Sequence, residues 1–192
     1  MGDNVKGITQ IEREKLDSNI EMEVVSKCLM KTRNNVAPVC GCFTGAFYKV
    51  FWCYLKHVVL GAIHQIFKDK ALPVTLRLGI IALIPKGAKD KQCIANWRPL
   101  MLLETLYKLL SSILATRSKP VLDNLLGCEQ KVYIPGRFIS ECTRNTYDIF
   151  QHAKTNNLPG FILIDSEKAF DSVSFDFILT TLGVFNFGDF FI

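Results

Sequence analysis

The chain has 192 residues, of which 49% are hydrophobic and 21% are charged, and its net charge at pH 7 is +5. This is enough apolar material for the core of one domain or of two small lobes. Neither the polar N-terminus nor the apolar stretch Ala46–Phe67, which lysines and histidines interrupt, predicts a signal peptide or a membrane span. The seven cysteines are therefore expected to be reduced thiols, and the location nuclear or cytoplasmic.

The first third of the chain is predicted to be helical. Residues 1–15 are expected to be a disordered segment or linker. Ser18 and Glu21 have the spacing of a capping box, which predicts a helix that ends near Asn34. A long apolar helix is expected over Ala46–Phe67.

Two strand-like runs then flank a basic turn. Leu76–Ile84 is rich in branched apolar residues and stops at Pro85, and Trp97–Leu103 is expected to be extended around Pro99. The turn between them, Lys86–Asp90, contains two lysines and a glycine.

The rest of the chain alternates helical spacing with one more apolar run. The expected elements are helices over Glu104–Arg117, from Pro120 onward, over Ser140–Lys154 and over Ser174–Leu182, and a strand over Phe161–Asp165. Short strands mixed with more numerous helices indicate an α+β fold.

Positive charge is concentrated in the middle of the sequence. Residues 86–119 contain seven lysines and arginines but only two acidic residues, Asp90 and Glu104. A polyanionic partner such as nucleic acid would explain this window, and so would an ordinary solvated basic face.

The run Phe161–Ile164 ends on Asp165. A carboxylate at the end of a buried strand must be paired, and a divalent metal ion is one suitable partner. An aspartate that caps a helix or turn is the alternative.

Five segments together resemble the reverse transcriptases of non-LTR (LINE-type) retrotransposons. They are Ile84–Lys86, Asn96–Leu100, Leu106–Leu110, Gln130–Arg137 and Ile164–Asp171. The resemblance runs from about Leu16 to Leu182 and rests on the order and spacing of the segments. It implies a partial right-hand polymerase, with the fingers over about residues 16–155 and the start of the palm over about residues 156–192.

The resemblance implies a site for nucleotidyl transfer around Asp165. Asp165 would be the first catalytic carboxylate and, with the backbone carbonyl of Ser166, would bind Mg²⁺. Phe170 would exclude a ribose 2′ hydroxyl by its bulk, although a core phenylalanine is the alternative. Asp171 would cap the helix that follows.

Basic residues would contact the nucleotide and the nucleic acid. Lys86 and Arg98 match fingers residues that contact the incoming triphosphate, and their chemistry suits phosphate; a solvated basic tip is the alternative. Lys89 and Lys91 are expected to contact phosphate backbones. Arg137 would lie near template or nucleotide, although this chain has Val132-Tyr133 where the family usually has Gly-Phe.

The 192 residues do not contain the Tyr-x-Asp-Asp motif that supplies the family's other palm carboxylates. Because two-metal transfer needs them, we expect a fragment of an RNA-directed DNA polymerase that is inactive by itself. Full-length relatives would use an RNA template, a DNA primer and dNTPs. A non-catalytic nucleic-acid-binding remnant and a non-functional product of a decayed element are the alternatives.

A zinc site is disfavoured. Cys40, Cys42, Cys53 and His57 could supply four ligands, but Cys-x-Cys is not the usual spacing of a zinc knuckle.

Overall fold

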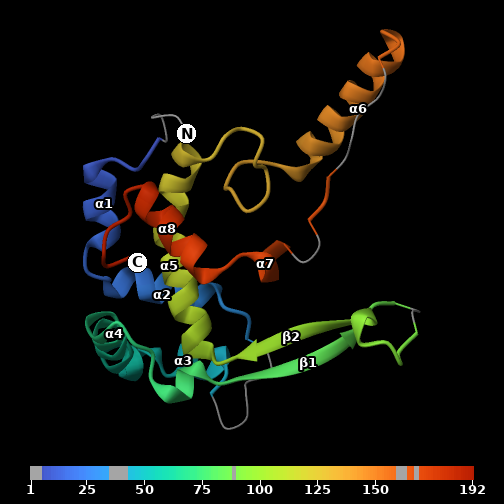
Figure 1. Ribbon diagram of the computed structural model, residues 1–192. Helices are drawn as coiled ribbons and strands as arrows, with labels where there is room; N and C mark the ends of the chain where they lie inside the picture. Colours follow the sequence, from blue (N-terminus) through green and yellow to red (C-terminus); the bar gives the residue numbers. More distant parts are fainter. Residues whose placement is uncertain (1–5, 35–42, 88–89, 159–163, 167–168) are drawn as a thin grey trace. The chain divides into compact units, whose positions relative to one another are not determined.

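The structure is a computed structural model, and it describes residues 6–34, 43–87, 90–158, 164–166 and 169–192 (Figure 1). In these ranges the chain is mostly helical, with one two-stranded sheet, in agreement with the α+β class. The chain divides into two compact units. Asn19–Thr116 is called the central unit, and Met1–Ser18 with Arg117–Ile192 the terminal unit.

Three helices open the central unit: α2 (Met22–Lys31), α3 (Gly45–Val50) and α4 (Trp52–Asp69). The single helix expected over Ala46–Phe67 is therefore wrong in one detail, because Phe51, with φ −93° and ψ 13°, separates α3 from α4. The hydroxyl of Thr44 caps α3 by accepting the N–H of Phe47 at 3.3 Å.

The expected capping box at Ser18 and Glu21 is wrong. Glu21 precedes α2 without a side-chain cap, and Ser18 instead ends helix α1 (Gln10–Asp17) of the terminal unit. The capping box of the structure joins Thr9 and Glu12 at the start of α1. The expectation of a disordered segment or linker over residues 1–15 is wrong from Gln10 onward, where α1 begins.

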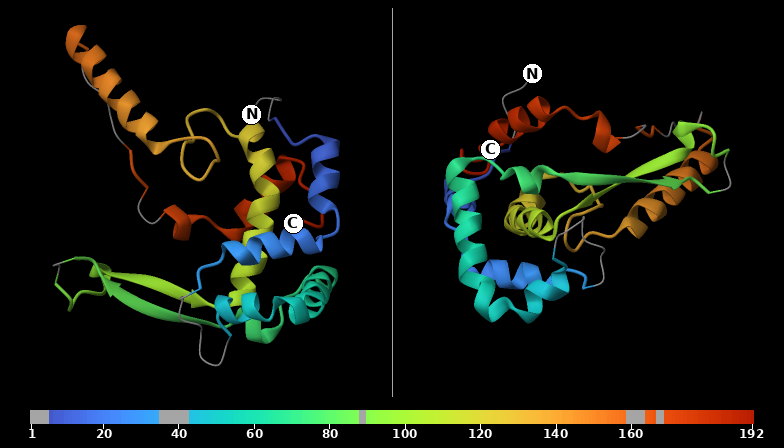
Figure 2. Two further views of the ribbon diagram at one scale, coloured as in Figure 1. Left: turned by 180° about the vertical axis from the view of Figure 1, so that it is seen from behind. Right: turned by 90° about the horizontal axis from the view of Figure 1, so that it is seen from below.

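A β-hairpin continues the central unit after the short helix η1 (Val74–Arg77). Strand β1 (Gly79–Pro85) pairs antiparallel with β2 (Trp97–Leu103), and η2 (Ile94–Asn96) directly precedes β2. Figure 2 shows the two strands as a long twisted ribbon. Residues 86–96, which connect the strands, are called the tip loop. Both strand predictions are confirmed: β2 has the predicted boundaries, and β1 begins three residues later and ends one residue later than predicted.

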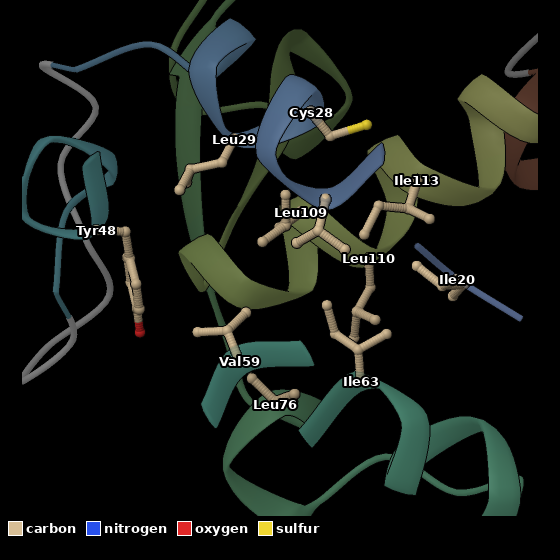
Figure 3. Close-up of a cluster of buried hydrophobic side chains, with 11 residues drawn as sticks. Ile20, Cys28, Leu29, Tyr48, Val59, Ile63, Leu76, Leu109, Leu110 and Ile113 are labelled. Carbon is tan, nitrogen blue, oxygen red and sulfur yellow. The ribbon is translucent and has the colours of Figure 1, made fainter. Parts of the chain in front are cut away.

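The core of the central unit is built around helix α5 (Thr105–Leu125). Leu109 and Ile113 of α5 belong to one cluster with Val25 and Leu29 of α2, and each of the four is at most 1% exposed. Figure 3 shows Leu29, Leu109 and Ile113 in this cluster. Burial of each such side chain contributes roughly 1.5–3 kcal/mol. The other buried side chains of this core are those of Ile20, Cys28, Tyr48, Val59, Ile63, Leu76 and Leu110.

Helix α5 runs through Pro120, so the prediction that Pro120 opens a new helix is wrong. A proline inside a helix lacks the N–H that would bond to the carbonyl four residues earlier, here that of Thr116. The residues on either side have strong helical spacing, which explains why α5 continues despite this loss.

The terminal unit contains α1, the end of α5, α6 (Ile139–Thr155), α7 (Ala169–Ser172) and α8 (Phe175–Val184). Its core joins distant parts of the sequence, since Ile8 and Leu16 pack with Val121 and Phe187. Helix α6 begins after Phe138 rather than at Ser140.

Two expectations for the last third concern capping and the strand before Asp165. The helix after Ser174 is confirmed, and the hydroxyl of Ser174 caps it by accepting the N–H of Phe177 at 3.2 Å. The N-cap position of α8 thus belongs to Ser174, and the side chain of Asp171, the expected cap of this helix, lies outside the described part of the chain. Phe161, Ile162 and Leu163 lie outside the described residues, and Ile164 is irregular and 90% exposed.

Among the described residues, no helix is both long enough and apolar enough to cross a membrane.

Candidate functional site

Lys86 and Arg98 lie close together at the tip end of the β1–β2 hairpin. The register pairs Ile84 with Arg98 and Pro85 with Trp97. Because side chains alternate between the faces of a strand, Lys86 and Arg98 fall on the same face. The backbone N–H of Lys86 extends the ladder by donating to the carbonyl of Asn96 at 2.7 Å.

The two cations differ in how they are engaged. Lys86 is half-buried, and its ammonium donates to the carbonyl of Ala95 at 2.9 Å, which leaves two of its three N–H groups for a ligand. Arg98 is exposed, and no described residue bonds to its guanidinium. A planar fork and a point charge on one face can bind neighbouring phosphates.

The tip loop is held by its own hydrogen bonds. Asp90 accepts the N–H of Gln92 on its carboxylate at 2.9 Å, and its carbonyl accepts the side-chain amide of Asn96 at 2.8 Å. The indole of Trp97 donates to the carbonyl of Lys91 at 2.9 Å, which leaves the Lys91 side chain exposed. Lys89 lies outside the described residues.

Asp165 and Ser166 are exposed and have no regular secondary structure. The premise that Asp165 is buried is thus wrong, whereas most of the strand expected before it lies outside the described residues. An exposed carboxylate remains suitable for a hydrated Mg²⁺ ion. No group of three or more metal-binding side chains occurs among the described residues. The side chain of Asp171 is not described.

Phe170 is not a core residue. It lies in α7 with 84% of its surface exposed. The ring of Tyr133 meets it edge-on, with 6.3 Å between ring centroids and 72° between ring planes.

Arg137 has a different environment from the one expected of a nucleic-acid contact. Its guanidinium donates to the Asp123 carboxylate at 2.8 and 3.1 Å, and to four backbone carbonyls, those of Asp123, Leu126, Gly127 and Gln130. All five N–H groups thus have acceptors within the chain, and the side chain is 15% exposed. In this structure Arg137 joins the end of α5 to the following loop.

The sequence singles out Gln130–Arg137 as a family-like segment, but it does not predict the contacts that hold the loop 127–137. Ile134 anchors it at 6% exposure, and Lys131 pairs with Glu141 at 2.6 Å. The hydrogen bond to Glu141 raises the pKa of Lys131. Tyr133 has φ +66°, which no pattern in the sequence predicts, since Pro135-Gly136 marks a turn only after it.

A cavity of about 320 Å³ in the central unit is lined mainly by apolar side chains of α4, η1 and α5, including Val59, Ile63, Leu76 and Leu110. None of the site residues predicted above lines it. The cavity is therefore distinct from the hairpin tip.

Comparison with known proteins assigns the chain to a family. A family model described as "Reverse transcriptase (RNA-dependent DNA polymerase)" matches residues 84–191, from the end of β1 almost to the C-terminal residue. The chain belongs to this family of reverse transcriptases.

One similar relative comes from a transposon. Over 191 residues the chain is 30% identical to the "Transposon TX1 uncharacterized 149 kDa protein" of Xenopus laevis. The alignment covers 99% of this chain but 14% of that protein. The predicted resemblance to a transposon reverse transcriptase is confirmed.

Proposed function

We propose that these 192 residues are the fingers and the start of the palm of a LINE-type retrotransposon reverse transcriptase. Residues from about 16 to 155 would form the fingers, and residues from about 156 to 192 would begin the palm. The observation that carries the proposal is the family match over residues 84–191, which includes both the basic hairpin tip and Asp165. The substrates of the longer enzyme would be an RNA template, a DNA primer and dNTPs.

Lys86 and Arg98 would bind the phosphates of the incoming nucleotide. Three observations support this: their shared face, the uncommitted guanidinium of Arg98 and the two spare N–H groups of Lys86. The hydrogen-bonded tip loop would preorganise these two residues for binding, which reduces the entropy lost when phosphate binds. Lys89 and Lys91 would contact phosphate backbones.

Asp165 would bind Mg²⁺ together with the backbone carbonyl of Ser166. Mg²⁺ commonly keeps several waters and is bound by one or two carboxylates and substrate phosphates. The ion would help to activate the primer hydroxyl and stabilise the leaving pyrophosphate. Phe170 would lie against the sugar of the nucleotide.

Nucleotide binding by the 192-residue chain tests the phosphate site. Titration with dATP and Mg²⁺, followed by amide chemical shifts, should show a Kd that Arg98→Ala weakens about tenfold, as expected for one lost charge-assisted contact. Arg98→Lys should recover only part of the loss, because lysine lacks the fork. Lys68→Ala, which removes an exposed charge on α4, is the matched control; equal losses in both alanine variants would show that only net charge matters.

Catalysis is tested separately. Two-metal transfer needs more carboxylates than Asp165, and the 192 residues do not contain Tyr-x-Asp-Asp. The segment alone should therefore not extend a DNA primer on an RNA template. Extension that disappears in Asp165→Ala would refute this expectation.

A second candidate, nucleic-acid binding without catalysis, is favoured by the exposed cations Lys91 and Arg98 at the hairpin. Binding to a primer–template duplex should then weaken steeply with salt, with a log–log slope that falls by about one for each phosphate contact removed. Affinity that is independent of salt would contradict it.

A further inference from the structure

Tyr133 has an unusual backbone conformation. Its φ of +66° lies in the left-handed region, which bulky residues seldom adopt. Strain of this kind persists only where the surroundings impose it, and it is concentrated at functional sites. Burial of the side chain does not offset this backbone strain, because 77% of its surface is exposed.

The surroundings that impose this conformation are identifiable. Arg137 donates to the carbonyls of Gly127 and Gln130, which precede Tyr133 in the loop, and Ile134, next to Tyr133, is buried. The side-chain amide of Gln130 donates to the carbonyl of Val132 at 3.1 Å. The loop thus fixes the backbone just before and just after Tyr133 and directs its ring outward.

The outward ring of Tyr133 meets Phe170. The rings make an edge-to-face contact, with centroids 6.3 Å apart, in the arrangement that aromatic pairs prefer. Phe170 belongs to α7, a single turn of four residues, and is itself 84% exposed. A short exposed helix restrains its side chains poorly. The ring of Tyr133 therefore limits the conformations that the Phe170 side chain can adopt.

We propose that Tyr133 is a positioning residue for Phe170 and thereby determines how strongly the site discriminates between deoxyribose and ribose nucleotides. The inference rests on the proposed function, in which Phe170 meets the sugar. Bulk excludes a 2′ hydroxyl only if the ring cannot move away from it. Tyr133 supplies that restraint from a loop that Arg137 holds in place.

The test compares dATP and ATP binding to the 192-residue chain in the presence of Mg²⁺. Tyr133→Ala should lower the ratio of the ATP Kd to the dATP Kd roughly three- to tenfold, the factor that corresponds to one aromatic pair. Tyr133→Phe should keep the wild-type ratio, because the ring edge is retained. In a Phe170→Ala background, Tyr133→Ala should change the ratio no further.

Tyr133→Gly separates the role of the ring from the stability of the loop. Glycine adopts positive φ without strain, so this variant should unfold at a higher urea concentration than Tyr133→Ala. It should nevertheless discriminate as poorly as Tyr133→Ala. The proposal would be overturned if, across these variants, the ratio of the ATP Kd to the dATP Kd followed the urea midpoint rather than the presence of an aromatic ring at position 133.

The possible failures are distinguishable. If dATP binds, depends on Lys86 and Arg98, and the ratio is unchanged in Tyr133→Ala, the positioning role is wrong and the proposed function stands. If neither nucleotide binds wild-type chain, the proposed function fails and the positioning role falls with it.

Discussion

Replacing Arg137 by alanine should destabilise the terminal unit and leave the central unit unchanged. The substitution removes six hydrogen bonds, of which the one to the Leu126 carbonyl, at 3.1 Å, is partly buried. A bond from a charged donor contributes about 1.5–3 kcal/mol where water cannot replace it. Water can replace the exposed bonds, which we count at a few tenths of a kcal/mol each. The total loss is on the order of 3 kcal/mol, a large part of the ~5–15 kcal/mol that stabilises a typical domain.

The assay uses two probes of urea unfolding. Both tryptophans, Trp52 and Trp97, lie in the central unit, so their fluorescence reports on that unit. Far-UV circular dichroism also detects α1, α6 and α8 of the terminal unit. In Arg137→Ala the dichroism transition should move to lower urea and separate from the fluorescence transition, which should stay in place.

Two controls make this prediction refutable. Arg144→Ala removes another arginine of the terminal unit. The side chain of Arg144 is 84% exposed, and its ion pair with Asp148 is long, at 4.0 Å, so this substitution should not change stability measurably. Arg137→Lys keeps the charge but loses the fork, so it should recover little. If Arg137→Ala unfolds like wild type, the hydrogen bonds do not support the fold, and Arg137 is again a candidate contact for nucleic acid.

Three further substitutions test local features. The hydrogen bond from the backbone N–H of Thr9 lowers the pKa of Glu12 from its ordinary value of 4.5. The stabilisation from this bond should therefore be present above pH 4.5 and disappear as the pH falls through the pKa of Glu12 in the folded state. In Glu12→Gln the urea midpoint of unfolding should depend less on pH over that range. Gly188→Ala would place a Cβ on the carboxylate of Asp17 and should cost about 1–3 kcal/mol, with most of it recovered in an Asp17→Ala background, whereas additive losses would contradict the contact. Pro120→Ala should stabilise α5 by about 1–3 kcal/mol, and a lower Tm would show that the helix does not run through this position.

The elements that were predicted well depend on local signals. The β1–β2 hairpin follows from two branched apolar runs that flank a basic turn, and α8 follows from the hydroxyl of Ser174 three residues before Phe177. In both cases neighbouring residues provide most of the information that determines the conformation.

The errors arise where distant contacts decide. Thr9-Gln-Ile-Glu12 and Ser18-Asn-Ile-Glu21 fit the same capping pattern, but only the first forms the capping box. Around it, Ile8 and Leu16 are buried against Val121 and Phe187, more than a hundred residues away in sequence. No local pattern contains that information.

The candidate site shows the same division, because residue type gives the chemistry and tertiary structure gives its availability. Arg98 and Arg137 are equally suited to phosphate by type. In the structure Arg137 has all five N–H groups engaged, so phosphate could bind it only by displacing the carbonyls that hold the loop 127–137. Arg98 needs no such exchange. If the chain binds phosphate as we propose, Arg98 is therefore better placed to do so than Arg137, and the role we propose for Arg137 is to hold the loop that presents the ring of Tyr133.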